Sequence, residues 1–497
     1  MRLEQLASLF IGSRIDGDGQ TAVTGIQTDS RRVRPGDLFI CVPGFVSDGH
    51  DFAAKAAQAG AAALVVERDV PVSLPKLFVK DARYAMAVIA CRFYEYPSRE
   101  LKLIGVTGTN GKTTTASLIE HILRDQKLRT GLMGTIGMKI GDAWFEAERT
   151  TQEAADLQMN LRKMRDAGTD YAVMEVSSHA LELGRVKGCR FRTALFTNLT
   201  QDHLDFHGTM DRYKAAKGLF FSRLGNEFSS DPNEAVYAVL NGDDDASADY
   251  AKMTSAQVVT YGLGEGADVR ATDIRIAPGG TRFTVTAFGE RADVSMKLVG
   301  KFNVYNALGA ISSTLIEGIP LPAIANSLER VSGVPGRMET VDAGAAAGYS
   351  VVVDYAHTPD GLQNALETIR EFCEGRIITV FGCGGDRDRS KRPLMGAVAA
   401  RGSDYVIVTS DNPRSERPEA IMADIEPGLT AEGASAERYA LIADRREAIY
   451  KAVEMASPRD VILIAGKGHE PIQIVGGVQH HFDDRLVAQE AIRSRSK

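Results

Sequence analysis

The chain has 497 residues, a formal net charge of -7 and 44% hydrophobic residues, which predicts a soluble globular protein of about three domains. The acidic balance excludes a broad basic surface, so we expect no nucleic-acid or membrane partner, and no apolar run approaches the roughly 18 residues of a membrane span. The five cysteines are scattered without a metal-binding or disulfide spacing, which predicts a cytosolic protein.

Residues 1–97 are predicted to form a small α/β domain. Three short apolar segments predict strands, and an alanine-rich segment between the first two predicts a helix. The strands are "DLFICVPG", "AALVVER" and "KLFVK", and the helix is "DGHDFAAKAAQAGA". The segment "YEYPSRE" follows, and we place the first domain boundary at its Pro97 because proline interrupts helices and strands.

Residues 98–335 are predicted to form a central domain with a doubly wound, mostly parallel sheet, because strands and helices alternate there. The predicted strands are "KLIGVTG", "YAVMEVSS", "TALFTNLT", "AVYAVLN" and "QVVTYG". Residues 268–301 are predicted as an antiparallel β excursion from this pattern. The segment "VSGVPGRME", rich in glycine and proline, marks the second domain boundary.

The first strand of the central domain enters a glycine-rich loop, "GVTGTNGKTTT", and a helix is predicted from about Thr113. Gly108 and Gly111 let backbone N–H groups approach phosphate oxygens, and Lys112 and the helix N-terminus add positive charge. The Thr113 hydroxyl is suited to holding Mg²⁺. The alternative is a glycine turn that opens an ordinary helix. The order of strand, loop, Gly-Lys-Thr and helix favours an ATP or GTP site.

Two later segments of the central domain carry candidate Mg²⁺ ligands. Glu175 ends the strand in "MEVSSH", and hard cations bind carboxylates together with phosphate oxygens. The loop "DHLDFHG" offers His203, Asp205 and His207, although a single histidine in such a loop could equally be part of an ordinary polar turn. Asp202 and His207 fit a structural role equally well. Lys217 lies in the helical pattern "YKAAKGLFF", which by itself predicts a surface lysine, or one whose stem is covered while its ammonium group reaches water.

Residues 336–497 are predicted to form a C-terminal Rossmann-like α/β domain. Each predicted strand of this domain ends in a polar loop. These segments are "SVVVDYAHTP", "RIITVFGCGG", "YVIVTSDNP" and "VILIAGKGHE". Ligands of open α/β sheets bind beyond the carboxyl ends of the strands, so the polar loops are the predicted binding residues.

Two of these loops carry an arginine, Arg387 in "GGDRDR" and Arg414 in "TSDNPRSE". A guanidinium pairs with a carboxylate through two parallel hydrogen bonds, and Pro413 stiffens the chain before Arg414. Asp411 and Glu470 add carboxylates that suit an ammonium group. Together these residues predict a pocket for the zwitterionic head of an amino acid. The alternatives for Arg414 are a simple turn or a surface ion pair.

A series of motifs, in order along the whole chain, resembles the Mur ligase family. They are "TDSRRVRPGDLFIC", "GVTGTNGKTTT", "TTQE", "MEVSSHALELGRV", "TNLTQDHLDFHG", "YKAAKGLF", "GKFNVYNALGA", "PGRME", "DYAHTPDGL", "GCGGDRDRSKRPLMG", "SDNPR" and "AGKGHE". Members are ATP-dependent bacterial enzymes of peptidoglycan precursor synthesis, and folylpolyglutamate synthetases are their relatives. The last three motifs are most similar to those of members that add meso-diaminopimelate to the D-glutamate of UDP-MurNAc-L-Ala-D-Glu. The resemblance implies an amide ligase that works through an acyl phosphate.

The resemblance also implies roles for particular residues. ATP would be bound by Gly108, Thr109, Asn110, Gly111, Lys112, Thr113, Thr114, Asn303, Arg337, Asp354 and His357, although position alone makes Asn303 a helix cap. Mg²⁺ would be held by Thr113, Glu175, His203 and a carbamylated Lys217, and catalysis would use Lys112, Glu175, His203 and Lys217. UDP-MurNAc-dipeptide would be bound by Thr28, Ser30, Thr150, Thr151, Ser177 and Arg185, with residues 45–47 beside the uridine diphosphate. Family members commonly carry proline after the threonine pair, where this chain has Gln152. Diaminopimelate would be bound by Arg387, Asp411, Asn412, Pro413, Arg414, Gly466 and Glu470.

Two other classes of protein stay open on the sequence alone. A P-loop kinase or nucleotide switch would not need the two arginine loops or a UDP-binding first domain. A non-catalytic sugar-nucleotide binding protein would not need Lys112, Glu175 and His203. Among ligases, a lysine-adding enzyme or a folate glutamyl ligase is the nearest rival, and lysine lacks the second carboxylate that would explain Arg414. We expect a monomer whose domains close around the substrates.

Overall fold

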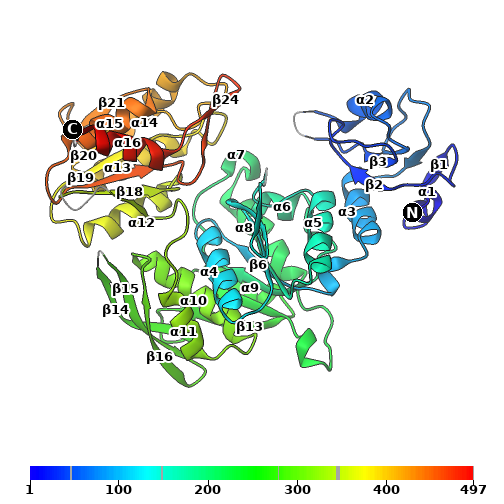
Figure 1. Cartoon of the computed structure of the whole chain (residues 1–497), viewed down its shortest axis with the longest axis horizontal. Helices are drawn as coiled ribbons and strands as arrows, with labels where there is room; N and C mark the ends of the chain where they lie inside the picture. Colours follow the sequence, from blue (N-terminus) through cyan, green and yellow to red (C-terminus); the bar gives the residue numbers. More distant parts are fainter. Residues whose placement is uncertain (45–46, 147–148, 278, 343–347, 496–497) are drawn as a thin grey trace. The chain divides into compact units, whose positions relative to one another are not determined.

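The computed structural model of the chain describes residues 1–44, 47–146, 149–277, 279–342 and 348–495 (Figure 1). The chain divides into two compact units, and each is described by itself. Unit 1 comprises Met1–Gly105, Lys127–Ala194 and Glu227–Val236, and unit 2 comprises Val106–Gln126, Leu195–Asn226 and Tyr237–Lys497. Within the described residues, no helix has both the length and the apolar character needed to cross a membrane.

The first sheet of unit 1 has the strand order β1-β5-β4-β3-β2. Its strands are β1 (Arg14–Asp16), β2 (Gly25–Gln27), β3 (Asp37–Ile40), β4 (Ala63–Val66) and β5 (Lys76–Phe78), and its helices are α1 (Leu3–Ala7), α2 (Ala53–Gln58) and α3 (Ala82–Phe93). Neighbouring strands are parallel, except that β1 is antiparallel to β5. Alternate residues of β3 face opposite sides, so Leu38 and Ile40 pack with α1 and α3 while Phe39 packs with α2.

The second sheet has the strand order β16-β15-β14-β13-β12-β11-β6-β10-β7-β8-β9. Unit 1 contributes β7 (Thr130–Gly134), β8 (Gly137–Ile140), β9 (Ala143–Phe145) and β10 (Tyr171–Glu175); β6 (Lys102–Thr107) and β11 (Phe191–Phe196) contain residues of both units. Unit 2 contributes β12 (Tyr237–Asn241), β13 (Gln257–Gly262), β14 (Val269–Ala277), β15 (Gly280–Ala287) and β16 (Glu290–Met296).

The pairing in this sheet confirms the predicted mixture of strand directions. The pairs β10–β7, β12–β13 and β13–β14 are parallel, whereas β14, β15 and β16 form the antiparallel excursion expected over residues 268–301. The antiparallel strands β8 and β9 were not predicted from the sequence.

The helices of this α/β region are α5 (Ala154–Asp166) and α6 (Ser178–Glu182) in unit 1, and α4 (Lys112–Asp125), α7 (Leu204–His207), α8 (Met210–Ser222), α9 (Ala246–Met253), α10 (Lys301–Leu315) and α11 (Leu321–Glu329) in unit 2. Short 3₁₀ helices lie at Gly49–Phe52, Pro97–Arg99 and Pro232–Glu234. Helix α4 follows β6 after only a short loop, so the helix N-terminus opens at the carboxyl end of the strand, as the sequence predicted.

The third sheet lies in unit 2 and has the order β17-β18-β22-β19-β20-β21. Its strands are β17 (Glu339–Val341), β18 (Ser350–Asp354), β19 (Ile377–Phe381), β20 (Tyr405–Val408), β21 (Tyr439–Leu441) and β22 (Val461–Ala465), parallel except for β17. Helices α12 (Pro359–Arg370), α13 (Lys391–Gly402) and α14 (Pro418–Ala431) cover one face, and α15 (Arg445–Met455) and α16 (Asp484–Arg495) cover the other. Both faces are buried, which explains why these strands read as continuous apolar runs.

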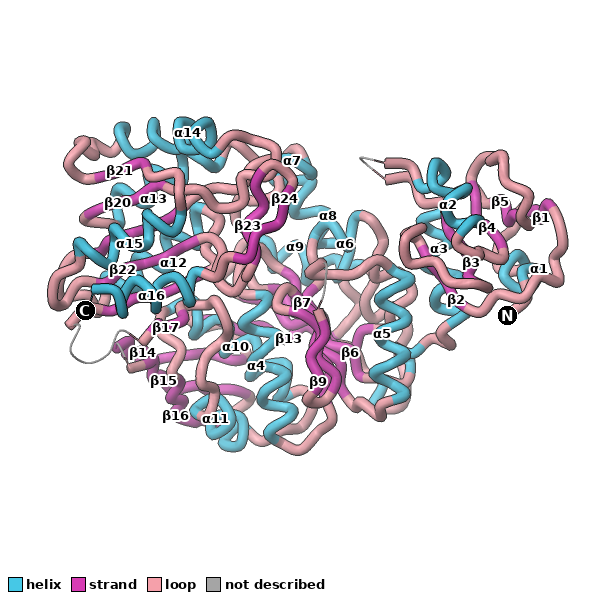
Figure 2. The backbone as a smooth tube through the Cα atoms, turned by 45° about the horizontal axis from the view of Figure 1, so that its top comes forward, coloured by secondary structure: helices cyan, strands magenta, loops and turns pink. Residues whose placement is uncertain are grey.

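A hairpin of β23 (Ile472–Val475) and β24 (Val478–His481) forms a separate two-stranded sheet after β22 (Figure 2). Its edges are short and largely exposed, and it was not predicted from the sequence. The fold is nonetheless the predicted α/β fold, with polar loops at the carboxyl ends of parallel strands.

Candidate active site

The loop between β6 and α4 is shaped by glycines that leave no room for a side chain. Gly108 has a φ of 151° and Gly111 a φ of 83°, both in the region that favours glycine. A Cβ on Gly111 would lie 2.3 Å from Oδ1 of Asn306, and one on Gly108 would lie 1.8 Å from Oγ1 of Thr197. The loop backbone therefore packs closely and leads into the N-terminus of α4, where N–H groups favour an anion.

Side chains hold this loop on both sides. The Oγ1 of Thr109 lies 3.1 Å from the hydroxyl of Tyr213, and the N–H of Asn110 donates to Oδ1 of Asn198 at 2.9 Å. The side chain of Asn110 reaches further and donates to Oδ2 of Asp360 on α12 at 2.7 Å. Since Thr114 is also buried in the first turn of α4, the loop has a single, well-supported shape.

Two lysines of unit 2 meet at the carbonyl groups of the loop. Nζ of Lys112 donates to the carbonyls of Gly108 and Thr109 at 2.8 and 2.7 Å, and Nζ of Lys217 donates to the carbonyl of Gly108 at 2.8 Å. Lys217 is only 1% exposed and lies over the ring of Tyr213, so the interpretation of Lys217 as a surface lysine is wrong. Burial, and then the charge of Lys112, lower the pKa of the Lys217 ammonium well below its ordinary value.

The loop before α7 places His203 beside a buried carboxylate. Nε2 of His203 lies 3.3 Å from Oδ2 of Asp202, and Nζ of Lys391 lies 3.8 Å from the other oxygen of Asp202. Burial opposes ionisation of Asp202, but the charges of His203 and Lys391 outweigh it and lower the pKa. His207 differs, because it is buried and its ring packs against Tyr213. Asp202 and His207 therefore have supporting contacts, and His203 has the more exposed side chain.

Arg337, in the link before β17, reaches the first turn of α4. Its Nη2 donates to Oγ1 of Thr113 at 3.0 Å, and its buried Nε has no hydrogen-bond partner among the described residues. Oδ2 of Asp354, at the end of β18, accepts from the N–H of Met338 at 2.6 Å and so fixes the chain beside Arg337. Burial raises the pKa of Asp354. This guanidinium is placed to bind phosphate oxygens near Thr113.

Asn303 lies in the first turn of α10, but the N-cap residue of that helix is Gly300, so the interpretation of Asn303 as a cap is wrong. Nδ2 of Asn303 instead donates to the carbonyl of Val299 at 2.9 Å, and its Oδ1 accepts from Asn306 at 3.0 Å. Asn306 in turn packs directly against Gly111, where it leaves no space for a Cβ. Asn303 thus supports the phosphate loop through Asn306.

His357 follows β18 and is neutral at neutral pH. Burial, reinforced by the charge of Lys391, lowers its pKa to about 4. Its Nδ1 lies 2.8 Å from the carbonyl of Tyr355, and its own carbonyl accepts from Nζ of Lys391 at 2.9 Å. Lys391 therefore bridges the His357 loop and Asp202, a role that the sequence reasoning missed.

Glu175 ends β10 in unit 1, and its carboxylate is held by Thr135. Its Oε1 accepts from the N–H of Thr135 at 2.8 Å, and its Oε2 accepts from the Thr135 hydroxyl at 3.1 Å. Hydrogen bonds among neighbouring side chains and backbone groups bring together four residues predicted for the nucleotide-sugar substrate: Thr150, Thr151, Ser177 and Arg185. The carboxylate of Glu175 is thus part of a polar cluster of unit 1.

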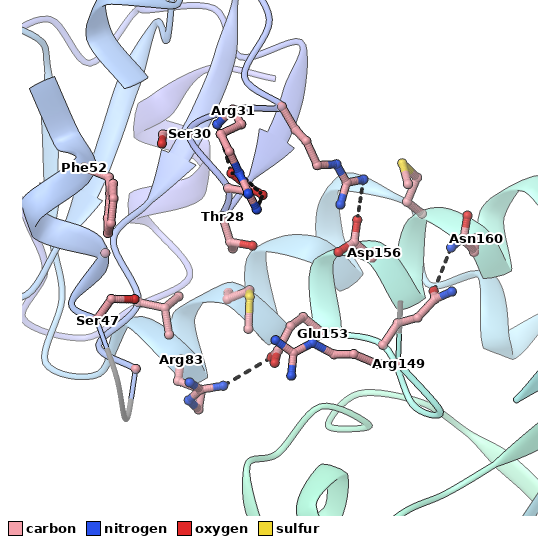
Figure 3. A pocket seen from close by; sticks show the side chains of 18 of the residues that line it. Thr28, Ser30, Arg31, Ser47, Phe52, Arg83, Arg149, Glu153, Asp156 and Asn160 are labelled. Carbon is pink, nitrogen blue, oxygen red and sulfur yellow. Dashed lines mark hydrogen bonds and ion pairs between the residues drawn. The ribbon is translucent and has the colours of Figure 1, made fainter. Parts of the chain in front are cut away.

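A cavity of about 750 Å³ lies in unit 1 (Figure 3). Thr28, Ser30 and Ser47 are among its lining residues, and Phe45, predicted beside them, lies outside the described residues. Its charged lining consists of the cations Arg31, Arg32, Lys55, Arg83, Arg149 and Lys163 and the acids Asp29, Glu146, Glu153 and Asp156. The excess of cations favours an anionic ligand. The sequence reasoning missed them because they come from separate segments that only the fold brings together.

The two arginines of the C-terminal loops lie together. Nη1 of Arg414 donates to the carbonyl of Gly385 at 2.7 Å, and a Cβ on Gly384 would lie 2.9 Å from that Nη1 and 3.6 Å from Cγ of Arg387. Arg414 has a φ of 53°, so its backbone is strained into the left-handed region. Burial, and then the charge of Arg387, lower the pKa of Arg414. Two neighbouring guanidinium groups favour a carboxylate ligand.

The carboxylates of this region differ in access. Asp411 is buried against Gly466, where a Cβ would lie 2.4 Å from its Oδ2, and burial raises its pKa. Glu470 is 34% exposed, and its Oε2 accepts from Nδ2 of Asn412 at 3.0 Å. Glu470 is therefore the more accessible of the two carboxylates.

The β23–β24 hairpin holds the Arg414 loop from the other side. The N–H of Arg414 donates to the carbonyl of Ile474 at 2.9 Å, and the carbonyl of Arg414 accepts from the N–H of Gly476 at 2.7 Å. Nε2 of Gln473 donates to the hydroxyl of Ser410 at 3.0 Å and to the carbonyl of Asp411 at 2.8 Å. This hairpin is the main part of the region that the sequence reasoning did not find.

Comparison with known families accounts for most of the chain. The models described as Mur ligase family, catalytic domain; Mur ligase middle domain; and Mur ligase, glutamate ligase domain match residues 22–94, 106–314 and 336–468. A curated relative from Bacillus cereus, named UDP-N-acetylmuramoyl-L-alanyl-D-glutamate--2,6-diaminopimelate ligase, is 50% identical over 495 residues, which cover 100% of this chain and 99% of the relative. The chain belongs to the Mur ligase family.

Other Mur ligases agree with this assignment. A relative of the same name from Geobacillus thermodenitrificans is 50% identical over 496 residues, covering 100% of both chains. A solved structure with that name is 34% identical, with a TM-score of 0.67 over 100% of this chain and 99% of its own. MurF from Acinetobacter baumannii, 21% identical with a TM-score of 0.68 over 99% of this chain and 97% of its own, shares the fold. The predicted family and the three-domain α/β fold are confirmed.

Proposed function

We propose that this Mur ligase adds meso-diaminopimelate to the D-glutamate of UDP-MurNAc-L-Ala-D-Glu with hydrolysis of ATP to ADP and phosphate. The observation that carries the proposal is the proximity of two arginines: Nη1 of Arg414 and Cγ of Arg387 both lie beside Gly384, and burial, and then the charge of Arg387, lower the pKa of Arg414. The names of relatives that are 50% identical over the whole chain support the same activity. We also propose that the domains comprise residues 1–97, 98–335 and 336–497, and that the protein is a monomer in the cytosol.

The amino-acid pocket explains the choice of diaminopimelate. This substrate has two zwitterionic heads, of which one is recognised while the amine of the other attacks. The arginine pair binds the carboxylate of the recognised head, and Glu470 binds its ammonium group. Lysine carries an amine but no carboxylate at the end of its side chain, so it would leave the two cations unpaired. This unpaired charge, on the half-buried Arg414 and the exposed Arg387, is the element that rejects lysine.

The phosphate loop and Arg337 serve the first chemical step. The γ-carboxylate of D-glutamate attacks the γ-phosphorus of ATP, the bond to ADP breaks, and an acyl phosphate forms. Lys112 and Arg337 stabilise the negative charge that spreads over the transferred oxygens. In the second step the amine of diaminopimelate attacks the acyl carbon, loses a proton, and displaces phosphate to leave the amide.

Lys217 fits the predicted carbamate. A buried lysine with a lowered pKa presents a neutral amine, which can add to carbon dioxide and release one proton to give an anionic carbamate. A carbonyl carbon signal from ¹³C-labelled bicarbonate, absent in a Lys217→Arg variant, would reveal the modification. A protein without that signal would have Lys217 acting as an amine.

The donor set of unit 2 fits Mg²⁺ bound together with ATP. Among the described residues, no group of three or more His, Cys, Asp or Glu side chains forms a metal site. The cation would instead use the Thr113 hydroxyl, His203, the Lys217 carbamate and phosphate oxygens, of which the oxygen donors are the kind that Mg²⁺ prefers. When bound, it neutralises charge on those oxygens. Glu175, the remaining predicted ligand, belongs to unit 1 and stays a prediction.

The cavity of unit 1 suits the nucleotide part of the second substrate. Its six cations outnumber its four acids, and Thr28, Ser30 and Ser47 supply hydroxyl groups. We assign the diphosphate to this cavity. The cluster of Thr151, Ser177 and Arg185 would then bind the peptide part, and the buried Nε of Arg185 has no hydrogen-bond partner among the described residues.

The test is phosphate release from ATP with Mg²⁺ and UDP-MurNAc-L-Ala-D-Glu, comparing meso-diaminopimelate with L-lysine. Turnover with diaminopimelate alone, lowered at least about 100-fold in Arg414→Ala, supports the proposal, because a lost charged hydrogen-bond pair costs about 3 kcal/mol. Arg417→Ala is the matched control, since Arg417 is exposed and pairs only weakly with Glu419. Equal turnover with lysine would reject the substrate, and release without any amino acid would indicate a kinase or a nucleotide switch.

A further inference from the structure

Tyr355 lies between two residues assigned to ATP, Asp354 and His357, yet has no assigned role. Its hydroxyl donates to Oε1 of Glu470 at 3.0 Å. The guanidinium carbon of Arg337 lies 4.6 Å from the centre of its ring. One side chain therefore touches the arginine assigned to phosphate and the carboxylate assigned to the amino-acid head.

The surroundings of Tyr355 fix its position. Its N–H donates to the carbonyl of Gly336 at 2.9 Å, and the ring of His469 packs at 5.4 Å between centroids. A Cβ on Gly468 would lie 2.8 Å from Cβ of Tyr355, and one on Gly336 would lie 2.2 Å from the N–H nitrogen of His469. Both glycines have positive φ angles, a conformation that favours glycine. The backbone on both sides of the ring therefore packs too closely for other residues.

The hydroxyl of Tyr355 supplies one of the two side-chain hydrogen bonds to the Glu470 carboxylate. The Oε1 of Glu470 accepts from Tyr355 and its Oε2 accepts from Asn412, so both carboxylate oxygens have a partner. Burial, and then the charge of Glu470, raise the pKa of the phenol well above its ordinary value. The phenol therefore stays a hydrogen-bond donor at every pH at which the protein would be assayed. A carboxylate tied at both oxygens keeps one orientation.

The ring face of Tyr355 acts on Arg337. A guanidinium over an aromatic face is attracted to it, and the ring limits the directions in which the fork can point. Nη2 of Arg337 is already directed to Thr113 on the phosphate side. The ring contacts the same group, 4.6 Å from its central carbon.

We propose that Tyr355 is a positioning residue for both half-sites, orienting Glu470 through its hydroxyl and Arg337 through its ring. The assignment of Glu470 to the amino acid rests on the proposed function. The two parts of the side chain can be removed separately, because phenylalanine keeps the ring and loses only the hydroxyl, whereas leucine loses both.

The experiment measures kcat and KM for ATP and for diaminopimelate in Tyr355→Phe and Tyr355→Leu. Tyr355→Phe is expected to raise KM for diaminopimelate about tenfold, the usual effect of one hydrogen bond to a charged group, while KM for ATP changes less than about twofold. Tyr355→Leu is expected to raise KM for ATP by a factor of about three to ten over its value in Tyr355→Phe. Tyr439→Phe is the matched control, because it removes a tyrosine hydroxyl that donates to Glu426 at 2.7 Å in the same sheet region.

A double-mutant comparison separates positioning from simple folding defects. In the Glu470→Gln background, Tyr355→Phe should add less than about a threefold effect on KM for diaminopimelate, because both changes remove the same interaction. The proposal would be overturned if Tyr355→Phe raised KM for diaminopimelate by the same factor in the Glu470→Gln background as in the wild type. It would also be overturned if Tyr355→Phe alone raised both KM values equally. If the wild type shows no diaminopimelate-dependent turnover, the proposed function fails instead. Nucleotide affinity in Tyr355→Leu and Tyr355→Phe still decides the role of the ring: equal affinities would reject it.

Discussion

Two regions of the molecule are suited to phosphate groups, and they are built in opposite ways. The loop of unit 2 offers backbone N–H groups, glycines without space for a Cβ, and lysines that contact loop carbonyls. The cavity of unit 1 offers six cationic side chains, several of which are already paired with acids such as Glu153 and Asp156. The first depends on backbone shape and the second on the sum of charges.

The difference predicts how each region responds to change. A backbone site fails when one atom is added, because close-packed neighbours have nowhere to move. A site made from several long cationic side chains should weaken gradually, because each contributes a modest, screened attraction. The loop should therefore be intolerant of small substitutions, and the cavity should tolerate them.

The largest effect is expected for Gly111→Ala. Its Cβ would lie 2.3 Å from Oδ1 of Asn306, which is itself held by Thr115, and its φ of 83° disfavours alanine. Strain and overpacking of about 3 kcal/mol correspond to a loss of about 100-fold or more in affinity for ATP. Binding of a fluorescent ATP analogue measures it directly.

Gly318→Ala is the matched control for that substitution. Gly318 has a φ of 81°, nearly the same as Gly111, but a Cβ there meets nothing within 4 Å. It should cost about 1 kcal/mol of stability and leave ATP affinity unchanged. Equal ATP affinities of the two variants would contradict a site determined by the packing of its backbone.

The Arg414 loop combines a charged side chain with a backbone held in one shape. Gln473→Ala tests the contribution of the backbone shape. Gln473 donates to Ser410 and to the carbonyl of Asp411, so its loss should loosen the loop that aims Arg414. We expect KM for diaminopimelate to rise about fivefold to tenfold with KM for ATP unchanged. Gln479→Ala, an exposed glutamine on β24, is the control, and a similar rise in that variant would show that the hairpin acts only through general stability.

These regions also show what the sequence could predict. The phosphate loop is local, so strand, glycines, Lys112 and helix follow one another and its position could be predicted from the sequence. The burial of Lys217 could not, because it depends on the packing of α8 against a loop about 109 residues earlier in the chain. Gln473 and Tyr355 were missed for a similar reason: each acts on a residue far away in sequence. Apart from the adjacent Arg31 and Arg32, the cations of the cavity are scattered along the chain and give no local pattern.

The ion pair between Arg392 and Glu416, close to the Arg414 loop, should make the stability of the fold depend on pH in the acid range. Hydrogen bonds from the fully buried guanidinium of Arg392, although opposed by burial, lower the pKa of Glu416 to about 2 from an ordinary 4.5. The ion pair therefore stabilises the fold fully above pH 4.5, and the stabilisation is lost as pH falls from 4.5 to 2. Glu416→Gln should lower the free energy of unfolding by about 2 kcal/mol at neutral pH, with the difference vanishing near pH 2. Urea unfolding across this range measures it, and Glu419→Gln, an exposed carboxylate, should show no such convergence.

The smallest effect is expected in the cavity of unit 1. Arg83 lines it and is partly neutralised by Glu153 at 3.2 Å, so Arg83→Ala should raise KM for the nucleotide-sugar substrate only about threefold at low salt. Added salt should shrink that factor towards one, because screening removes the contribution that Arg83 makes. Arg99→Ala, a cation of unit 1 that is not among the described lining residues, is the control and should change neither KM nor its salt dependence. A loss near 100-fold that persists at high salt would show that Arg83 makes a fixed, direct contact. The cavity would then be built like the phosphate loop.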